Sequence, residues 1–372
     1  MYAYFIRRLL LVIPTLFGIM LLNFIVIQIV PGGPVEQLIA QLSGTAVSPT
    51  ARFTGGAGET APSASAQSLS LQPDSSITSK YRGARGLDPA FIKKIEKMYG
   101  MDKPLHIRFF DMMRKYITFD FGESFYQNRR VIDLVLDKIP VSISLGLWTT
   151  LLVYFISIPL GIAKAVRDGT RFDIATSGVI TFAYAIPGYL FAILLIIFLA
   201  GGRYLSLFPL RGLVSENWKE LSLLGKIADY FWHMTLPILA MVIGGFAGLA
   251  MLTKNFFIDQ IKMQYVTTAR AKGLTERQVL FRHVFRNAML LVIAGLPSAF
   301  ISILFTGSLL IEVIFSLDGL GLLGFEAALK RDYPVMFGSL FFFSLLGLIM
   351  GIVGDLMYVA IDPRIDFESR EV

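Results

Sequence analysis

The sequence has no cysteine and little charge, and both absences narrow the possible functions. Without cysteine among its 372 residues, the chain can form no disulfide, zinc–thiolate site or catalytic thiol. The three histidines, His106, His233 and His283, are too far apart in sequence to show a metal-ligand spacing. Charged residues account for 16% of the chain, whereas soluble domains average about 25%. With 55% hydrophobic residues, the composition indicates an integral membrane protein.

The sequence also lacks the motifs of nucleotide hydrolysis and of common hydrolytic enzymes. There is no GxxxxGK[ST] phosphate loop, no HExxH and no GxSxG. The DFG at 120–122 has no glycine-rich loop, VAIK lysine or HRD loop beside it, so it does not indicate a kinase. We therefore expect no catalytic residue, no metal and no cofactor in this chain. The net charge of +7 is interpreted as cations that flank membrane spans, not as a nucleic-acid surface.

Long apolar segments dominate what is present. About twenty apolar residues suffice to cross the hydrocarbon core as a helix, and six segments of the chain reach that length. The short connections rich in lysine and arginine, including residues 164–171, are expected in the cytoplasm together with both termini. The sequence thus predicts an all-α integral membrane protein with six transmembrane helices. The expected spans are residues 9–30, 141–164, 174–200, 234–253, 288–314 and 336–361.

The polar segments divide the chain further. Residues 43–87 are dominated by small and polar residues, and they are interpreted as a flexible insertion in a larger outer region. The rest of that region contains an amphipathic stretch after Pro104. The expected parts are a first transmembrane helix at 1–30, an outer region at 31–140 with its insertion at 43–87, a five-helix core at 141–361 with cytoplasmic helices at 254–287, and a cytoplasmic tail at 362–372.

The most informative polar stretch is residues 254–287, KNFFIDQIKMQYVTTARAKGLTERQVLFRHVFRN. It holds seven lysines and arginines and two acids, so its net charge is 7 − 2 = +5. Ile258, Ile261 and Tyr265 recur at helical spacing, which predicts one helix that Gly273 ends in a left-handed cap. Thr275 and Gln278 are spaced as a capping box that starts a second helix. The pattern predicts a bent helical element at the membrane surface.

Several of these segments resemble one protein family. YVTTARAKGL at 265–274 and RHVFRNA at 282–288 resemble the cytoplasmic coupling motif of peptide-type ABC importer permeases, the oligopeptide and dipeptide permease family. The opening span, the EVIFSLDGLGLLGFEAALKRDYPV stretch at 312–335 and the DPR at 362–364 resemble the same family. The Gly/Ser-rich insertion and KYRGARGLDP at 80–89 are most similar to its Yej-type B branch.

The resemblance implies a fold, partners and a docking site. It implies a type I ABC importer permease in the bacterial inner membrane, with the 31–140 region in the periplasm. The implied partners are a second homologous permease, an ABC ATPase with one or two nucleotide-binding domains that binds the ATP, a periplasmic peptide-binding protein, a peptide substrate and membrane lipid. The residues implied to dock on the ATPase are Tyr265, Thr268, Ala269, Arg270, Ala271, Lys272, Gly273 and Leu274.

Candidate pathway or gate residues are fewer, and each has a structural alternative. Pro187 and Gly188 predict a bend that lines the pathway or is a packing kink. Glu312 and Asp355 lie within spans, where a carboxylate contacts a substrate or gate, or forms a structural ion pair. Asp318 and Gly319 are placed near the outer mouth by the family resemblance. The competing functions are an ion-driven secondary transporter, which predicts charges within the spans and inverted halves, and an intramembrane enzyme.

Overall fold

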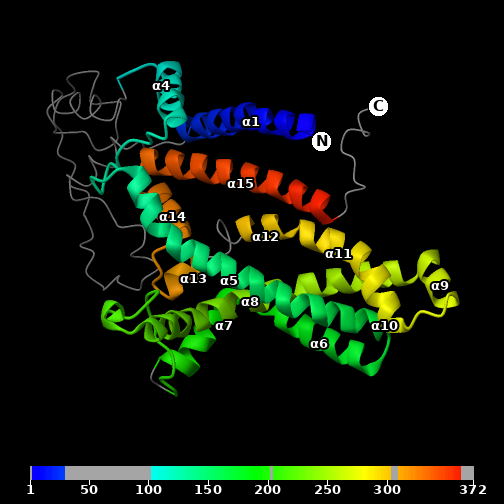
Figure 1. The fold of residues 1–372 in the computed structure, drawn as a ribbon. Coiled ribbons are helices and arrows are strands. Elements are labelled where there is room, and N and C mark those ends of the chain that lie inside the picture. The colour runs from blue at the N-terminus through cyan, green and yellow to red at the C-terminus, as the bar shows by residue number, and fades with distance from the viewer. Residues whose placement is uncertain (1, 30–101, 202–203, 303–308, 362–372) are drawn as a thin grey trace, which may run out of the picture. The chain divides into compact units, whose positions relative to one another are not determined.

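The computed structural model describes residues 2–29, 102–201, 204–302 and 309–361 (Figure 1). The predicted insertion at 43–87, the KYRGARGLDP segment and the tail at 362–372 lie outside these residues. Within the described ranges the chain is helical, apart from turns, loops and one isolated bridge between Glu123 and Arg130. The first elements are α1 (Tyr2–Ile29), α4 (Leu105–Ile117), α5 (Val131–Val166), α6 (Arg171–Ala185), α7 (Gly188–Leu195), a π-helical turn (Ile196–Ala200) and a 3-10 turn (Trp218–Glu220).

The remaining elements complete an all-α architecture. They are α8 (Leu223–Ile261), α9 (Gln264–Ala271), α10 (Glu276–Gln278), a π-helical turn (Val279–Val284), α11 (Phe285–Ala294), α12 (Leu296–Ser302), α13 (Leu309–Ile314), α14 (Leu320–Lys330) and α15 (Tyr333–Ile361). Among the described helices, four are long and apolar enough to cross a membrane: α1, α5, α8 and α15. A fifth span is counted if α6, α7 and the turn after α7, which bend by 87°, form one crossing.

The spans α5 and α8 begin about ten residues earlier in the chain than the sequence predicted. The helix α5 starts at Val131, not at Val141, and continues through Pro140. One proline removes a single backbone donor, which a long helix tolerates when its neighbours satisfy the freed groups. The helix α8 starts at Leu223, not at Met234, because the Ser222 side chain accepts a hydrogen bond from the Gly225 amide at 3.2 Å.

The predicted span at 288–314 corresponds to three short helices in the described residues. These are α11, α12 and α13, and residues 303–308 between the last two lie outside the described ranges. The count of six spans therefore stays a prediction, whereas the all-α membrane architecture is observed.

The chain divides into two compact units. One unit comprises residues 1–14, 135–323 and 342–372, and the other comprises 15–134 and 324–341. The first unit has an aliphatic core that joins α5, α8 and α11, with Leu145, Met234 and Val292 almost fully buried. The second unit is held by aromatic rings, with 4.9 Å between the centroids of Tyr116 and Phe121 and 5.3 Å between those of Phe24 and Phe109.

Small residues bring α5 and α8 into close contact along the first unit (Figure 1). A Cβ atom built on Gly161 would lie 2.6 Å from the Thr253 Cβ and 2.7 Å from the Ala250 carbonyl oxygen. Further along α5, the Ser157 hydroxyl donates to the Phe246 carbonyl at 2.9 Å. The two long helices therefore pack backbone against backbone, as membrane helices do where small residues line the contact.

Candidate functional site

The basic segment predicted from sequence folds as a bent helical element at the end of α8. The structure breaks the predicted single helix at Met263, whose φ of −73° and ψ of 149° are extended. The helix α8 ends at Ile261 and α9 begins at Gln264, so Ile261 and Tyr265 lie in different helices. The spacing alone missed this break, because both side chains still pack on the same core.

The turn after α9 follows the sequence prediction closely. Gly273 adopts a φ of +80°, and its amide donates to the Arg270 carbonyl at 2.9 Å. Glycine enters this left-handed conformation without steric cost. Thr275 and Gln278 then form the predicted capping box: the Gln278 amide donates to the Thr275 hydroxyl at 3.4 Å, and the Thr275 amide donates to the Gln278 side chain at 3.0 Å. The bent element is thus encoded locally.

An ion pair closes the turn from the outside. The Arg270 guanidinium donates to both oxygens of Glu276 at 2.8 and 3.0 Å, a fork that fixes the angle between α9 and α10. The hydrogen bond from Arg270 lowers the pKa of the Glu276 carboxyl, and the same bond raises the pKa of Arg270. Both side chains are well exposed, so the pair orders the turn more than it stabilises the fold.

The predicted docking residues do not all face outward. Val266 and Ala269 are buried, and they attach α9 to the core of the first unit. Tyr265 is half-buried and donates to the Gln260 side chain at 3.0 Å. Leu274 is half-buried and packs on the same core. The exposed face consists of Thr268, Arg270, Ala271, Lys272 and Gly273. It presents two small residues among cations.

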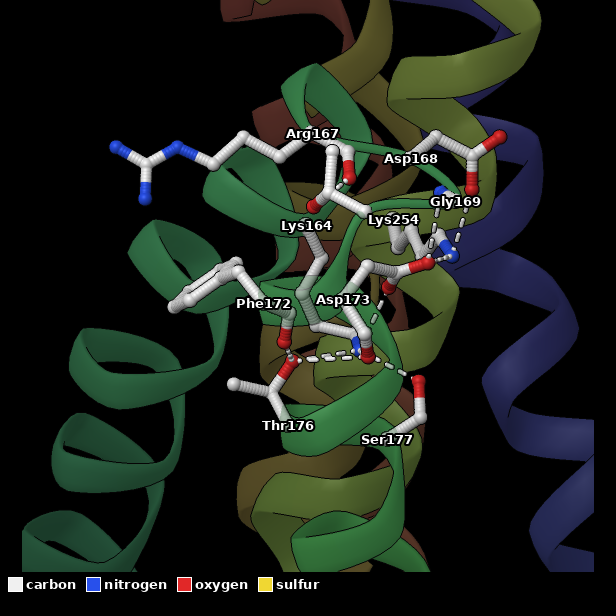
Figure 2. A network of polar contacts seen from close by, with 10 residues as sticks. Lys164, Arg167, Asp168, Gly169, Phe172, Asp173, Thr176, Ser177 and Lys254 are labelled. Carbon is white, nitrogen blue, oxygen red and sulfur yellow. Dashed lines mark hydrogen bonds and ion pairs between the residues drawn. The ribbon is translucent and has the colours of Figure 1, made fainter.

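A buried polar cluster lies in the same unit, where α5, α6 and α8 meet (Figure 2). Lys164 has no exposed surface, and its amino group contacts one Asp173 carboxylate oxygen at 2.8 Å. The amino group also donates to the Asp173 carbonyl at 2.9 Å and to the Thr176 and Ser177 hydroxyls at 3.0 and 2.7 Å. These last three acceptors take the three ammonium protons, and the Asp173 oxygen balances the buried charge as an ion pair without a hydrogen bond of its own.

Lys254 of α8 completes this cluster. Its amino group contacts the second Asp173 oxygen at 2.7 Å and Asp168 at 2.8 Å. The Gly169 amide donates to the same Asp173 oxygen at 3.2 Å, which ties the loop between α5 and α6 to the cluster. We call Lys164, Asp173 and Lys254 the inner charge cluster. Two lysines share one buried carboxylate, and the more exposed Asp168 balances the charge.

Sequence reasoning missed this cluster. The sequence placed Lys164 in a short basic cytoplasmic loop, and Asp173 was not singled out. The available signal was an acid in the first turn of a helix, nine residues after a lysine at the end of the preceding span. An ionisable residue so close to apolar spans is costly unless it is paired. Periodicity does not reveal such a partner.

The predicted break at Pro187–Gly188 is present and borders a cavity. Pro187 is the N-cap of α7, and the helix axis turns by 87° there. A Cβ atom on Gly188 would lie 3.0 Å from the Ala240 carbonyl oxygen, so α7 packs closely on α8. The neighbouring cavity of about 440 Å³ lies in the first unit. Its lining is mainly apolar and includes Thr149, Tyr154, Gly188, Tyr189, Met241 and Gly244.

Glu312 lies in α13, and its side chain is buried against the turn before α14, not exposed to a pathway within the described residues. It has no exposed surface, and its carboxylate accepts a hydrogen bond from the Leu322 amide at 2.7 Å, in the first turn of α14. The carboxylate lies where a side chain on Gly319 would be. Asp318, by contrast, is exposed and pairs with Lys138 of α5. The Glu312 carboxylate thus accepts a hydrogen bond from one of the free backbone amides at the start of α14.

Asp355 forms an ion pair within its own chain. Its carboxylate pairs with Arg8 and accepts a hydrogen bond from the Tyr4 hydroxyl at 3.1 Å. All three residues belong to the first unit. The pair agrees with the structural alternative for an acid in a span, here satisfied by a cation of the same chain.

Family comparison shows to which class of protein this all-α membrane architecture, with its bent basic element, belongs. Residues 157–367 match the family of binding-protein-dependent transport system inner membrane components, and the chain belongs to this family. The match begins at residue 157 within α5 and continues past the end of α15, so it includes the bent element and all three residues of the inner charge cluster.

Individual relatives agree over the full length. The chain is 59% identical over 370 residues to the peptidoglycan transport system permease protein YejB of Agrobacterium fabrum, covering 100% of both chains. It is 58% identical to the inner membrane ABC transporter permease protein YejB of Escherichia coli O157:H7, over 99% of this chain and all of that one. The oligopeptide transport system permease protein AppB of Bacillus subtilis is 30% identical over 99% of this chain and 100% of that one.

These relatives decide between the functional classes. The chain is a multi-pass inner membrane permease of an ABC transporter, not an ion-driven secondary transporter. It is a non-catalytic transport component, so it is not an enzyme. The predicted resemblance to the Yej-type B branch is confirmed. An ABC permease works with an ATPase and, in this family, with a substrate-binding protein.

Proposed function

We propose that the chain is one of two homologous permease subunits of an ATP-driven peptide importer, and that residues 265–274 dock on its ATPase. The peptide cargo is supported by the names of the relatives, which describe transport of peptidoglycan and of oligopeptides. The other partners are an ATPase with one or two nucleotide-binding domains, a periplasmic peptide-binding protein and membrane lipid. Both termini are cytoplasmic in this arrangement.

The single observation that carries the docking proposal is the exposed face of α9. Arg270 and Lys272 flank Ala271, and Gly273 follows Lys272, so a partner groove can approach the backbone at Ala271 between two cations. Behind this face, Val266 and Ala269 are buried in the core, so α9 is fixed to the rest of the unit. A force applied to α9 is therefore carried into the transmembrane helices. The partner surface that would complement this charge is an acidic groove.

The mechanism follows from this attachment. ATP-driven closure of the ATPases displaces α9, and α8 moves with it because only Lys262 and Met263 separate the two helices. The permeases then switch between inward and outward access, and a peptide released by the binding protein crosses between them. The cavity beside Pro187 and Gly188 is a candidate for one wall of that pathway. The break there lets α6 and α7 tilt separately.

The test is copurification of the complex from detergent, followed by peptide uptake in vesicles. Ala271→Glu adds a bulky anion to the exposed face, whereas a side chain at Gly273 would also strain the turn at φ +80°. We expect the variant to retain the second permease but to lose the ATPase and uptake. Ala228→Glu, at an exposed alanine near the other end of α8, is the matched control. Normal ATPase retention and uptake in Ala271→Glu contradict the docking proposal.

A further inference from the structure

The inner charge cluster joins three helices, α5, α6 and α8, of which only α8 leads directly into the bent element. Lys164 lies in the last turn of α5, Asp173 in the first turn of α6, and Lys254 on α8 (Figure 2). Lys254 is seven residues before Ile261, where α8 ends, which is about two helical turns. The cluster therefore sits at the base of the bent element and links two other helices to it.

Because the cluster is buried, it holds the three helices in one defined arrangement. Lys164 is completely buried, and the Asp173 and Lys254 side chains are 8% and 11% exposed. Buried ion pairs contribute little to net stability, because desolvation offsets the attraction, and apolar residues of similar volume often serve as well. What buried charges do provide is a defined arrangement, since each displaced partner leaves an unpaired charge. Such a contact resists sliding between helices more than an apolar contact does.

The other end of α5 is also held by polar contacts. Near its start, Lys138 pairs with Asp318, and the Ser142 hydroxyl accepts the Leu320 amide at 2.8 Å. These contacts fix α5 to the loop between α13 and α14. Ser142 and Lys164 are 22 residues apart in one helix, so they lie roughly 33 Å apart along its axis. The helix α5 thus connects the inner charge cluster to a loop near the opposite end of the same unit.

We propose that Lys164, Asp173 and Lys254 are positioning residues of energy coupling: they make α5 and the start of α6 move with α8 when the ATPase displaces α9. The displacement then reaches Asp318 and the start of α14 at Leu320 through α5. This inference rests on the proposed docking of α9. It assigns the cluster a role in converting ATPase movement into transport, separate from assembly with the ATPase.

The test compares transport with ATP hydrolysis in the reconstituted complex. Lys254→Met removes one cation and Lys254→Arg keeps it, whereas Lys219→Met makes the same change at an exposed lysine outside the cluster. We expect Lys254→Met to keep its ATPase and hydrolysis while peptide transported per ATP falls by about tenfold. Lys254→Arg should restore coupling, and Lys219→Met should equal the unmodified complex. A Lys254→Met complex that transports within about twofold of normal overturns the inference.

A second variant tests the same inference if Lys254→Met fails to fold. Lys164→Met with Asp173→Leu replaces the buried pair by apolar side chains, a change that commonly preserves folding. This protein should assemble and hydrolyse ATP without normal transport, and full coupling in it would overturn the inference. The proposed function fails separately, if the unmodified chain holds no ATPase or if Ala271→Glu retains it. If docking is confirmed but the cluster variants couple normally, only the positioning role is wrong.

Discussion

The Glu312 carboxylate occupies the position of the missing side chain of Gly319. A Cβ atom on Gly319 would lie 2.5 Å from the Glu312 carboxyl carbon and from one of its oxygens. The turn before α14 therefore needs glycine because it encloses a buried acid. This relationship explains why the acidic residue and the DGLG sequence occur together within ten residues of each other.

Gly319→Ala is expected to destabilise the protein by about 1–3 kcal/mol, because the buried carboxylate must move and give up its bond from the Leu322 amide. Gly324→Ala in α14 is the matched control, since a Cβ atom there meets nothing within 4 Å. Thermal unfolding in detergent measures both variants. Equal midpoints for the two would show that Glu312 does not restrict Gly319.

Gly161→Ala is expected to weaken the contact between α5 and α8. The added methyl group collides with Thr253 and with the Ala250 carbonyl, and overpacking of this kind costs about 1–3 kcal/mol. Gly178→Ala in α6 has open space around the new methyl group, and alanine favours a helix, so its stability should equal or exceed that of the unmodified chain. A midpoint for Gly161→Ala at or above that of Gly178→Ala would contradict the close packing.

Asp332 should make stability depend on pH. It is buried in the second unit between α14 and α15, and it accepts hydrogen bonds from the Ser124 hydroxyl at 2.5 Å and the Phe125 amide at 3.2 Å. Burial raises the pKa of its carboxyl above the ordinary 3.8, against the opposing effect of these bonds. The folded chain then binds this proton more readily than the unfolded chain. The stabilisation that comes from protonated Asp332 is complete below pH 3.8 and is lost as the pH rises through the raised pKa.

Asp332→Asn removes that titration. Unfolding midpoints of the variant and the unmodified chain, measured from mildly acidic to neutral pH, should change relative to each other in favour of the variant as pH rises. A constant offset over the whole range reflects only the altered hydrogen bonds. Parallel curves would therefore contradict a raised pKa at Asp332.

Local signals were the most predictable parts of this protein. Thr275 and Gln278 formed the capping box, and Gly273 took the left-handed turn, because each depends on residues only a few positions apart. The long apolar spans were also recognisable from composition. The starts of two spans were harder to predict, because α8 begins after Ser222 and α5 begins at Val131, both outside the apolar runs.

Long-range polar partners were not predictable. Lys164 reads as a flanking cation in sequence, and only the folded chain shows that it is buried against Asp173. The break at Met263 was hidden for a related reason: Ile261 and Tyr265 keep helical spacing while their helices separate. Ala269 was likewise expected to dock on the ATPase together with the rest of the motif, although its side chain faces the core.

The absence of cysteine permits a direct test of docking. A single cysteine at Ala271, labelled with a benzophenone maleimide in the assembled complex, reports which subunit lies against α9. Illumination should join this chain to the ATPase, and a cysteine at Ala228 treated in the same way should not. Crosslinking to the ATPase from Ala271 alone is the result we predict. No ATPase adduct from Ala271, or equal adducts from both positions, would contradict docking through residues 265–274.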